Sequence, residues 1–186
     1  TPMSIMVATG RGATHGVLFR DAAAIENLRK VDTLIVDKTG TLTEGRPTFE
    51  KAVGVGGFKP DEVLRLAASL DQGSEHPLAD AIVRAARDKG LSLTKADDFE
   101  SGSGIGVRGT VEGKHLVLGN TALMQQENVA TDALKADAER LRREGGSVMH
   151  LAVDGRLAGI LAVTDPIKAT TADAIKTLHD SGLRIV

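Results

Sequence analysis

The sequence contains no cysteine, no tryptophan and no tyrosine, and aromatic residues make up only 2% of its 186 positions. Without cysteine the chain can form neither a disulfide framework nor a thiolate metal site, which fits a reducing compartment. Because large aromatic side chains are so scarce, valine, leucine, isoleucine and alanine must fill most of the hydrophobic core. Apolar residues amount to 41% of the chain, which is enough for one domain of ordinary size or two small ones.

An excess of one charge and a long apolar run are also missing. The chain carries 23 Lys and Arg against 25 Asp and Glu, a formal net charge of −2. No stripe of basic residues is present, so we expect no nucleic acid among its partners. No apolar run approaches the roughly 20 residues that cross a bilayer, and no signal peptide is present. "TPMSIMVATG" opens without an initiator Met and "SGLRIV" ends as a strand begins, so we expect both ends to be cuts in a larger protein.

Hydrophobic spacing and turn residues divide the chain into two kinds of structure. "TLIV" at 33–36 is a short apolar run, typical of a parallel strand buried on both faces. Glu112-Gly113 and Asp154-Gly155 each separate two apolar segments, which predicts two β-hairpins, whereas "KADDFES" at 95–101 shows no strand pattern. This order indicates an antiparallel α+β domain inserted into an α/β domain. Helical spacing predicts helices over 21–30, 60–72, 77–90, 131–146 and 170–182.

Asp37 follows the apolar run in "VDTLIVDKTGTLTEG", residues 31–45. A side chain at the carboxyl end of a parallel strand points into the crevice where α/β sheets bind ligands. Lys38 adds a positive charge, Thr hydroxyls and turn amides can hold phosphate oxygens, and Gly40 permits a tight turn. Asp37 could therefore attack a phosphoryl group, with a cation such as Mg²⁺ offsetting the charge. An isolated Asp would more simply cap a turn, but capping does not account for the whole string "DKTGTLTEG".

Two helix starts carry polar groups. "SEHPLADAIV", residues 74–83, begins a helix with Ser74 or Glu75 as the cap and a proline in the first turn. On its own, His76 indicates nothing beyond a surface helix. Asn120 precedes another apolar segment and is typical of an N-cap.

A glycine-rich stretch, "GSGIGVRG" at 102–109, contains the dinucleotide-binding pattern in its last six residues. That pattern must follow a strand and open a helix, and here β alternation follows it, so a dinucleotide site is excluded. The loop either lets the backbone approach a nucleotide or only eases the start of a hairpin. The other histidines show no metal-ligand spacing, and we interpret them as structural or solvent-facing: His15, His115, His150 and His179.

The string "DKTGTLTEG" closely resembles the phosphorylation motif of P-type ATPases, which carry an aspartyl phosphate on a haloacid-dehalogenase-like domain. The resemblance implies that Asp37 is the nucleophile and that its carboxylate and the Thr39 carbonyl bind Mg²⁺. It also places Lys38 and Thr41 in the catalytic group, with Thr41 at the phosphoryl group. Phosphatases of the wider superfamily usually carry a second Asp where this chain has Thr39. The acyl phosphate should therefore persist, as a pump requires.

Ser-Glu-His-Pro-Leu resembles the nucleotide-binding domain of the heavy-metal branch of these pumps. The resemblance implies that His76 lies against adenine with Glu75 beside it, and that Asn120 completes the ATP site. It also implies four residues of the glycine-rich loop, Gly102, Gly104, Ile105 and Gly106. "TDPIK", 164–168, resembles the hinge that returns the chain to the phosphorylation domain, with Asp165 and Lys168 near the phosphates. A proline-containing turn explains these two residues nearly as well.

The implied fold is a partial α/β haloacid-dehalogenase-like phosphorylation domain with an inserted α+β nucleotide-binding domain, an antiparallel sheet flanked by helices. The expected division is a membrane-proximal connector at 1–30, the first part of the phosphorylation domain at 31–46, the nucleotide-binding domain at 47–162, and a truncated returning segment at 163–186.

The implied function is the ATP-binding, phosphoryl-accepting cytoplasmic segment of an integral membrane pump that exports copper(I), with ATP and Mg²⁺ as cofactors. "TPMSIMV" favours copper(I), bound outside this chain, over zinc or cadmium. The implied partners are the transmembrane and actuator regions of the same parent protein. Two alternatives remain: an isolated ATP-binding module without catalysis, and a soluble haloacid-dehalogenase phosphatase, which Thr39 and the large insert disfavour.

Overall fold

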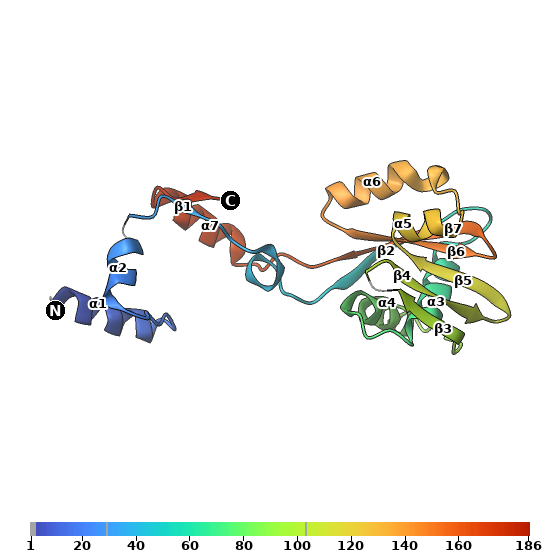
Figure 1. Ribbon diagram of the computed structural model, residues 1–186, viewed down its shortest axis with the longest axis horizontal. Coiled ribbons are helices and arrows are strands. Elements are labelled where there is room, and N and C mark those ends of the chain that lie inside the picture. The colour runs from blue at the N-terminus through green and yellow to red at the C-terminus, as the bar shows by residue number, and fades with distance from the viewer. Residues whose placement is uncertain (1–2, 29, 103) are drawn as a thin grey trace. The chain divides into compact units, whose positions relative to one another are not determined.

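The computed structural model describes every residue except 1–2, 29 and 103 and divides the chain into two compact units (Figure 1). Unit 1 combines Thr1–Leu42 with Lys168–Val186, and unit 2 is the continuous segment Thr43–Ile167. Unit 2 is thus inserted into the sequence of unit 1. Of the expected connector at 1–30, Thr1, Pro2 and Arg29 lie outside the described residues.

In unit 1, a strand from the N-terminal part of the chain pairs with a strand from the C-terminal part. β1 (Thr33–Leu34) and β8 (Arg184–Ile185) form a two-stranded parallel sheet. Three helices and a short turn segment complete the unit: α1 (Met3–Thr14), α2 (Ala22–Leu28), α7 (Thr171–Asp180) and the turn segment Lys38–Leu42. The helices expected over 21–30 and 170–182 are confirmed, and the Asp21 carboxylate caps the first one by accepting from the Ala24 amide at 2.8 Å.

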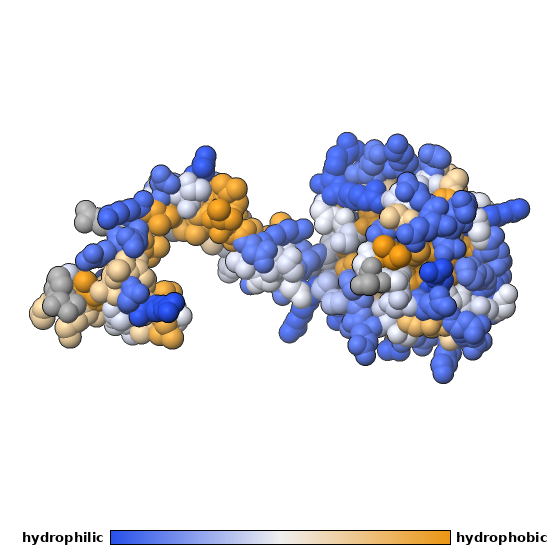
Figure 2. Space-filling model, viewed as in Figure 1, coloured by the Kyte–Doolittle hydropathy of each residue, from blue (hydrophilic) through white to orange (hydrophobic). Residues whose placement is uncertain are grey.

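The expectation that residues 33–36 are buried on both faces is wrong. Ile35 is 82% exposed, because within the described residues the sheet of unit 1 has only two strands. Other large apolar side chains of unit 1 are exposed as well, including Met3, Met6 and Leu18. Figure 2 shows hydrophobic residues on the surface of this unit. Among the described residues, no helix has both the length and the apolar character that a bilayer crossing requires.

Unit 2 is built on a six-stranded antiparallel sheet with the strand order β2-β7-β6-β5-β4-β3. The strands are β2 (Thr48–Gly54), β3 (Asp97–Gly102), β4 (Gly106–Val111), β5 (Lys114–Gly119), β6 (Ser147–Val153) and β7 (Arg156–Thr164). Figure 1 shows helices covering both faces of the sheet. They are α3 (Pro60–Asp71) and α4 (Pro77–Asp88) on one face, and α5 (Thr121–Gln126) and α6 (Lys135–Arg143), preceded by a 3₁₀ turn at Asp132–Leu134, on the other. The expected antiparallel sheet flanked by helices is confirmed.

The two hairpins are confirmed, and their turns show why local chemistry predicts them. Glu112 and Gly113 have φ of 54° and 74°, and Asp154 and Gly155 have φ of 48° and 73°. Positive φ at both central residues defines the type I′ turn, whose twist matches that of the flanking strands.

The prediction that residues 95–101 form no strand is wrong, because β3 spans Asp97–Gly102 and pairs with β4. β3 lies at the edge of the sheet, and a register shift between Asp97 and Glu100 interrupts it. Within β3, Phe99 is the hydrophobic residue that packs against the core, so charged residues hide the alternation, as is common at sheet edges. The dinucleotide pattern at 104–109 still fails, because a strand and not a helix follows it.

The core of unit 2 fills both faces of the sheet with aliphatic side chains. Leu66, Leu70 and Ile82 pack α3 and α4 against one face, and Leu141 packs α6 against Ile160 on the other. His150 of β6 is buried at 2% exposure, and its Nδ1 has no hydrogen-bond partner among the described residues. Burial, and secondly the charge of Arg142, lower the pKa of the His150 imidazole.

We predict that His150 makes unit 2 acid-sensitive. The folded-state pKa of His150 is depressed, so below about pH 6.5 the unfolded chain takes up a proton that the native state resists. The free energy of unfolding therefore decreases as the pH is lowered through this range. His150→Phe should flatten this dependence in denaturant titrations at a series of pH values. His115→Gln, at an exposed position, should not, and an unchanged slope in His150→Phe would contradict the prediction.

Candidate functional site

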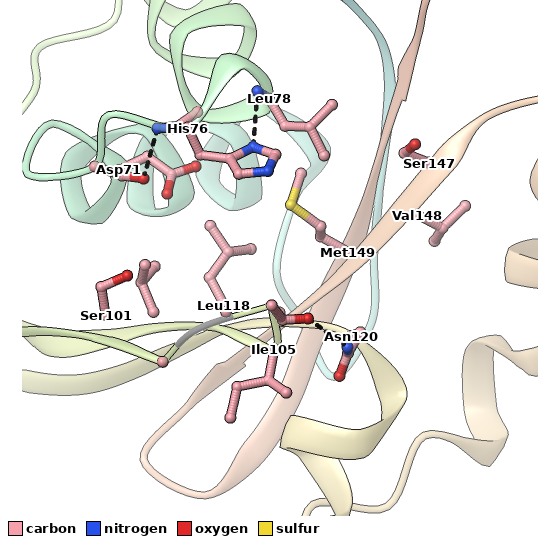
Figure 3. Close-up of a pocket in the computed structure, with 17 residues that line it drawn as sticks. Asp71, His76, Leu78, Ser101, Ile105, Leu118, Asn120, Ser147, Val148 and Met149 are labelled. Carbon is pink, nitrogen blue, oxygen red and sulfur yellow. Dashed lines mark hydrogen bonds between the residues drawn. The ribbon is translucent and has the colours of Figure 1, made fainter. Parts of the chain in front are cut away.

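Unit 2 contains a cavity of about 300 Å³ between the start of α4 and strands β3 to β6 (Figure 3). Six of the seven residues predicted to bind nucleotide line it: His76, Gly102, Gly104, Ile105, Gly106 and Asn120. Glu75 is not among the lining residues. The remaining walls are Asp71, Ser74, Leu78, Ala79, Ser101, Val107, Leu118, Gly119, Ser147, Val148 and Met149.

His76 is itself the N-cap of α4, where Ser74 or Glu75 was expected. Pro77 occupies the first helical position and has no amide hydrogen, so the first donor needing a partner belongs to Leu78. The His76 Nδ1 accepts from that amide at 3.2 Å. An accepting Nδ1 assigns the proton of the neutral ring to Nε2. Figure 3 shows the ring directed toward Met149, so His76 presents a donor at the cavity.

The glycine-rich loop is held by a close approach of two strands. Gly106 of β4 lies opposite Gly119 of β5. A Cβ added to Gly106 would lie 2.2 Å from the Leu118 carbonyl oxygen, and one added to Gly119 would lie 2.2 Å from the Ile105 carbonyl oxygen. Neither position accepts a larger residue without moving backbone.

Asn120 ties this loop to α5. Its Oδ1 accepts from the Leu123 amide at 3.0 Å, as an N-cap does, and its Nδ2 donates to the Gly104 carbonyl at 3.2 Å. Gly104 has φ of +73°, in the left-handed region that glycine adopts without strain. Asn120 therefore caps a helix and shapes the cavity with the same amide group.

Asp71 is the residue that sequence reasoning missed. It ends α3, is 4% exposed, and its Oδ2 has no hydrogen-bond partner among the described residues. Burial raises the pKa of this carboxyl to about 7. The spacing of α3 contained the signal, because Asp71 follows Leu64 and Ala67 by seven and four residues and so shares their apolar face. A carboxylate at a helix C-terminus also opposes the helix dipole.

The Asp37 segment in unit 1 forms a tight turn. Thr39 (φ −76°, ψ 124°) and Gly40 (φ 74°, ψ −15°) are the central residues of a type II turn, which needs glycine at its second central position. The Lys168 ammonium donates to the Gly40 carbonyl at 2.7 Å, and the Thr171 hydroxyl donates to the Leu42 carbonyl at 2.7 Å. The start of α7 therefore fixes the turn that follows Asp37.

Asp165 fastens the two ends of unit 2 to each other. Its Oδ2 accepts from the Thr43 hydroxyl at 2.6 Å and its Oδ1 from the Arg46 amide at 3.1 Å. Thr43 and Ile167 form an antiparallel bridge beside this contact. Neither Asp165 nor Lys168 lines the cavity, and both have structural partners that account for them.

The donors expected for Mg²⁺ are one carboxylate, Asp37, and one carbonyl, Thr39. Among the described residues, no group of three or more His, Asp or Glu gathers to hold a metal ion. Mg²⁺ prefers oxygen ligands and often takes one or two carboxylates together with waters and substrate phosphates. The two oxygen donors therefore fit a cation that arrives with a nucleotide.

Comparison with known proteins gives a consistent result. Residues 31–186 match the haloacid dehalogenase-like hydrolase family. The whole chain is 50% identical to 23% of a silver exporting P-type ATPase of Salmonella typhimurium, and 52% identical to 22% of a copper-transporting P-type ATPase of Rhizobium leguminosarum bv. viciae. The chain thus spans about a quarter of the length of these curated relatives.

Solved structures agree with the sequence comparisons. A zinc-transporting PIB-type ATPase in the E2.Pi state matches with a TM-score of 0.77 and 31% identity, over 98% of this chain and 29% of that one. The N-domain of HMA6, a copper-transporting P-type ATPase, matches with a TM-score of 0.54 and 28% identity, over 63% of this chain and 98% of that one.

We predict that Asp71→Asn stabilises unit 2 increasingly as pH rises. Below about pH 4 the carboxyl is protonated in both states; above it the unfolded chain loses the proton while the folded chain keeps it up to about pH 7. The advantage of the variant should grow by roughly 2–3 kcal/mol between pH 5 and pH 8 in denaturant titrations. Asp88→Asn, at an exposed position of α4, is the control, and an equal pH profile for both variants would refute the assignment.

Proposed function

Because the chain belongs to the haloacid dehalogenase-like hydrolase family and resembles the catalytic part of copper- and silver-transporting P-type ATPases along its whole length, we propose that it binds ATP and accepts the γ-phosphoryl group on Asp37. The observation that carries this proposal is the cavity of unit 2, where six of the residues that the resemblance implies for nucleotide binding meet, although they lie in three separate stretches of the sequence.

The cavity suits an adenine base. Its described lining includes Ile105, Leu118 and Met149 but no Phe, Tyr or Trp, so aliphatic and thioether groups would pack on the base beside the His76 imidazole. The Nε2–H of His76 can donate to a ring nitrogen. The Asp71 Oδ2, which is buried and has no hydrogen-bond partner among the described residues, can accept from the exocyclic amine when the carboxyl is ionised. Guanine carries an oxygen at that position, which an ionised Asp71 would repel, so the site should favour adenine.

The phosphoryl step uses the turn of unit 1. An Asp37 Oδ attacks the γ-phosphorus; the bond from that phosphorus to the bridging oxygen breaks, and its electron pair leaves with ADP. The Asp37 carboxylate and the Thr39 carbonyl would hold Mg²⁺, which offsets the negative charge of the two reactants. The Lys38 ammonium and the Thr41 hydroxyl stabilise the transferring group. Thr39 offers no acid or base to activate water, so the acyl phosphate persists.

The persistence of the phosphoenzyme suits a transport cycle, in which its formation and decay drive export of copper(I) bound elsewhere in the parent protein. Identity of about 50% to silver and copper transporters, against 31% to the zinc transporter, favours a monovalent cargo. In this proposal the chain is the cytoplasmic part of an integral membrane protein, and its partners are the transmembrane and actuator regions of that protein.

A second candidate is an ATP-binding module without catalysis in the chain as given. It is supported because the cavity lies entirely in unit 2, and because the separate HMA6 N-domain covers 63% of this chain. A soluble phosphatase is less well supported, because Thr39 stands where phosphatases of the superfamily place an acid.

We predict that ATP binding to this chain depends on unit 2 alone. His76→Asn keeps an N-cap oxygen for the Leu78 amide but removes the ring, and Gly104→Asp puts a side chain and a charge at a φ of +73°. Each should weaken ATP binding by roughly tenfold in calorimetric titrations. Asp37→Asn should leave it unchanged.

His76→Gln completes this experiment, because glutamine caps helices poorly. If His76→Asn binds ATP with wild-type affinity while His76→Gln binds it more weakly, His76 acts only as a helix cap, and the proposal that it contacts the nucleotide is wrong. Amide shifts of α4 report whether the helix start is intact in each variant.

We predict that the full-length parent forms an acid-stable phosphoenzyme that Asp37→Asn abolishes. Thr39→Asp should shorten its lifetime at least about tenfold, because a general base is now present, whereas Thr39→Asn adds similar volume without that chemistry. Labelling with γ-labelled ATP, followed by an unlabelled chase, measures the lifetime. Equal lifetimes for both variants would remove Thr39 from the explanation.

A further inference from the structure

The nucleotide cavity contains nothing that neutralises a triphosphate. Its lining includes no Lys or Arg among the described residues, and its only carboxylate, Asp71, has the wrong sign. A base and a sugar fit such a site, but phosphates carrying several negative charges do not. If ATP binds here, its phosphates must lie outside the cavity, where cations can neutralise them, and unit 2 has candidates close by.

A second hollow, of about 380 Å³, adjoins the same turn of α4. Leu78 and Ala79 face the nucleotide cavity, whereas Pro77, Asp80 and Arg84 face this hollow. The spacing of three and seven residues places the latter on one stripe of the helix. The opposite wall is the segment Gly45–Pro47, which includes Arg46.

Arg84 is held in place without a carboxylate. Its Nε donates to the Asp80 carbonyl at 3.3 Å, and one of its Nη atoms donates to the Pro47 carbonyl at 3.1 Å. These bonds fix the guanidinium plane and leave further N–H donors for an anion. Across the described residues, no carboxylate forms an ion pair with Arg84 or Arg46.

The amides of α4 do not take this role. Pro77 has none, the Leu78 amide donates to the His76 ring, and the Ala79 and Asp80 amides donate to the His76 carbonyl at 2.9 and 3.2 Å. Anion binding at this end of the helix therefore falls to the two guanidinium groups.

We propose that this hollow is the polyphosphate subsite of the ATP site, in which Arg84 and Arg46 bind phosphate oxygens of a nucleotide whose base occupies the cavity on the other side of the first turn of α4. The inference rests on the proposed ATP-binding function. Asp80 lines the same hollow and repels the anion, so its removal should tighten binding.

The test is a calorimetric titration of the chain with adenosine, AMP, ADP and ATP. Arg84→Gln and Arg46→Gln should each weaken ATP about five- to tenfold and leave adenosine unchanged, with ADP and AMP in between. Arg84→Lys should restore part of the loss, and Asp80→Asn should strengthen ATP binding. Arg87→Gln, the same charge change on an exposed position of α4, should alter nothing.

Each contrary result has a distinct meaning. Equal weakening of adenosine and ATP by Arg84→Gln would make Arg84 a structural residue, and no weakening of ATP would remove the hollow from the site. Saturable binding of inorganic phosphate alone, unaffected by ATP, would assign the hollow to a free anion and overturn the proposal. Failure of wild type to bind either adenosine or ATP would instead refute the nucleotide site itself.

Discussion

The cavity of unit 2 depends on one close approach of backbone, at the point where Gly106 of β4 lies opposite Gly119 of β5. Because a Cβ on either glycine would meet a carbonyl oxygen at 2.2 Å, the two strands can only close at this distance when both side chains are hydrogen. The closure brings Asn120 next to the Gly104 carbonyl, so that one amide both starts α5 and fixes the loop. The start of α5 and the shape of the cavity therefore both depend on the side-chain amide of Asn120.

The cavity keeps groups that a stability-optimised core would not contain. Asp71 places a buried carboxyl on the apolar face of α3 and at its negative end, with one oxygen that has no hydrogen-bond partner among the described residues, and both positions disfavour the charge. His76 caps α4 with a ring nitrogen where serine or aspartate is the usual choice. Departures from local rules at two residues of one cavity are expected of a binding site, where stability is balanced against ligand contact, and so they agree with the proposed function.

Local chemistry explains what could be predicted from the sequence. The Glu112-Gly113 and Asp154-Gly155 turns need φ values that few residue pairs adopt, and α4 begins at Pro77 and ends before a left-handed Gly90. Tertiary context explains what could not. β3 has a polar edge, so its strand pattern is masked, and the exposure of Ile35 depends on how many strands join its sheet. The burial of Asp71 could not be predicted without knowing which face of α3 is covered. The position of Arg84 depends on its hydrogen bond to the Pro47 carbonyl, which lies 37 residues away in the sequence.

The hydrogen bond between Thr43 and Asp165 has a consequence for how the sequence of unit 2 can vary in evolution. The first and last residues of unit 2, Thr43 and Ile167, pair in an antiparallel bridge. For unit 1, the whole insert is therefore equivalent to a short loop whose ends are already held together. The loop-closure entropy of unit 1 is then nearly independent of the length and sequence in between. Insertions, losses and exchanges within unit 2 can accumulate without disturbing the chain that carries Asp37, so the proposed nucleotide recognition and the proposed phosphoryl chemistry can evolve as separate modules.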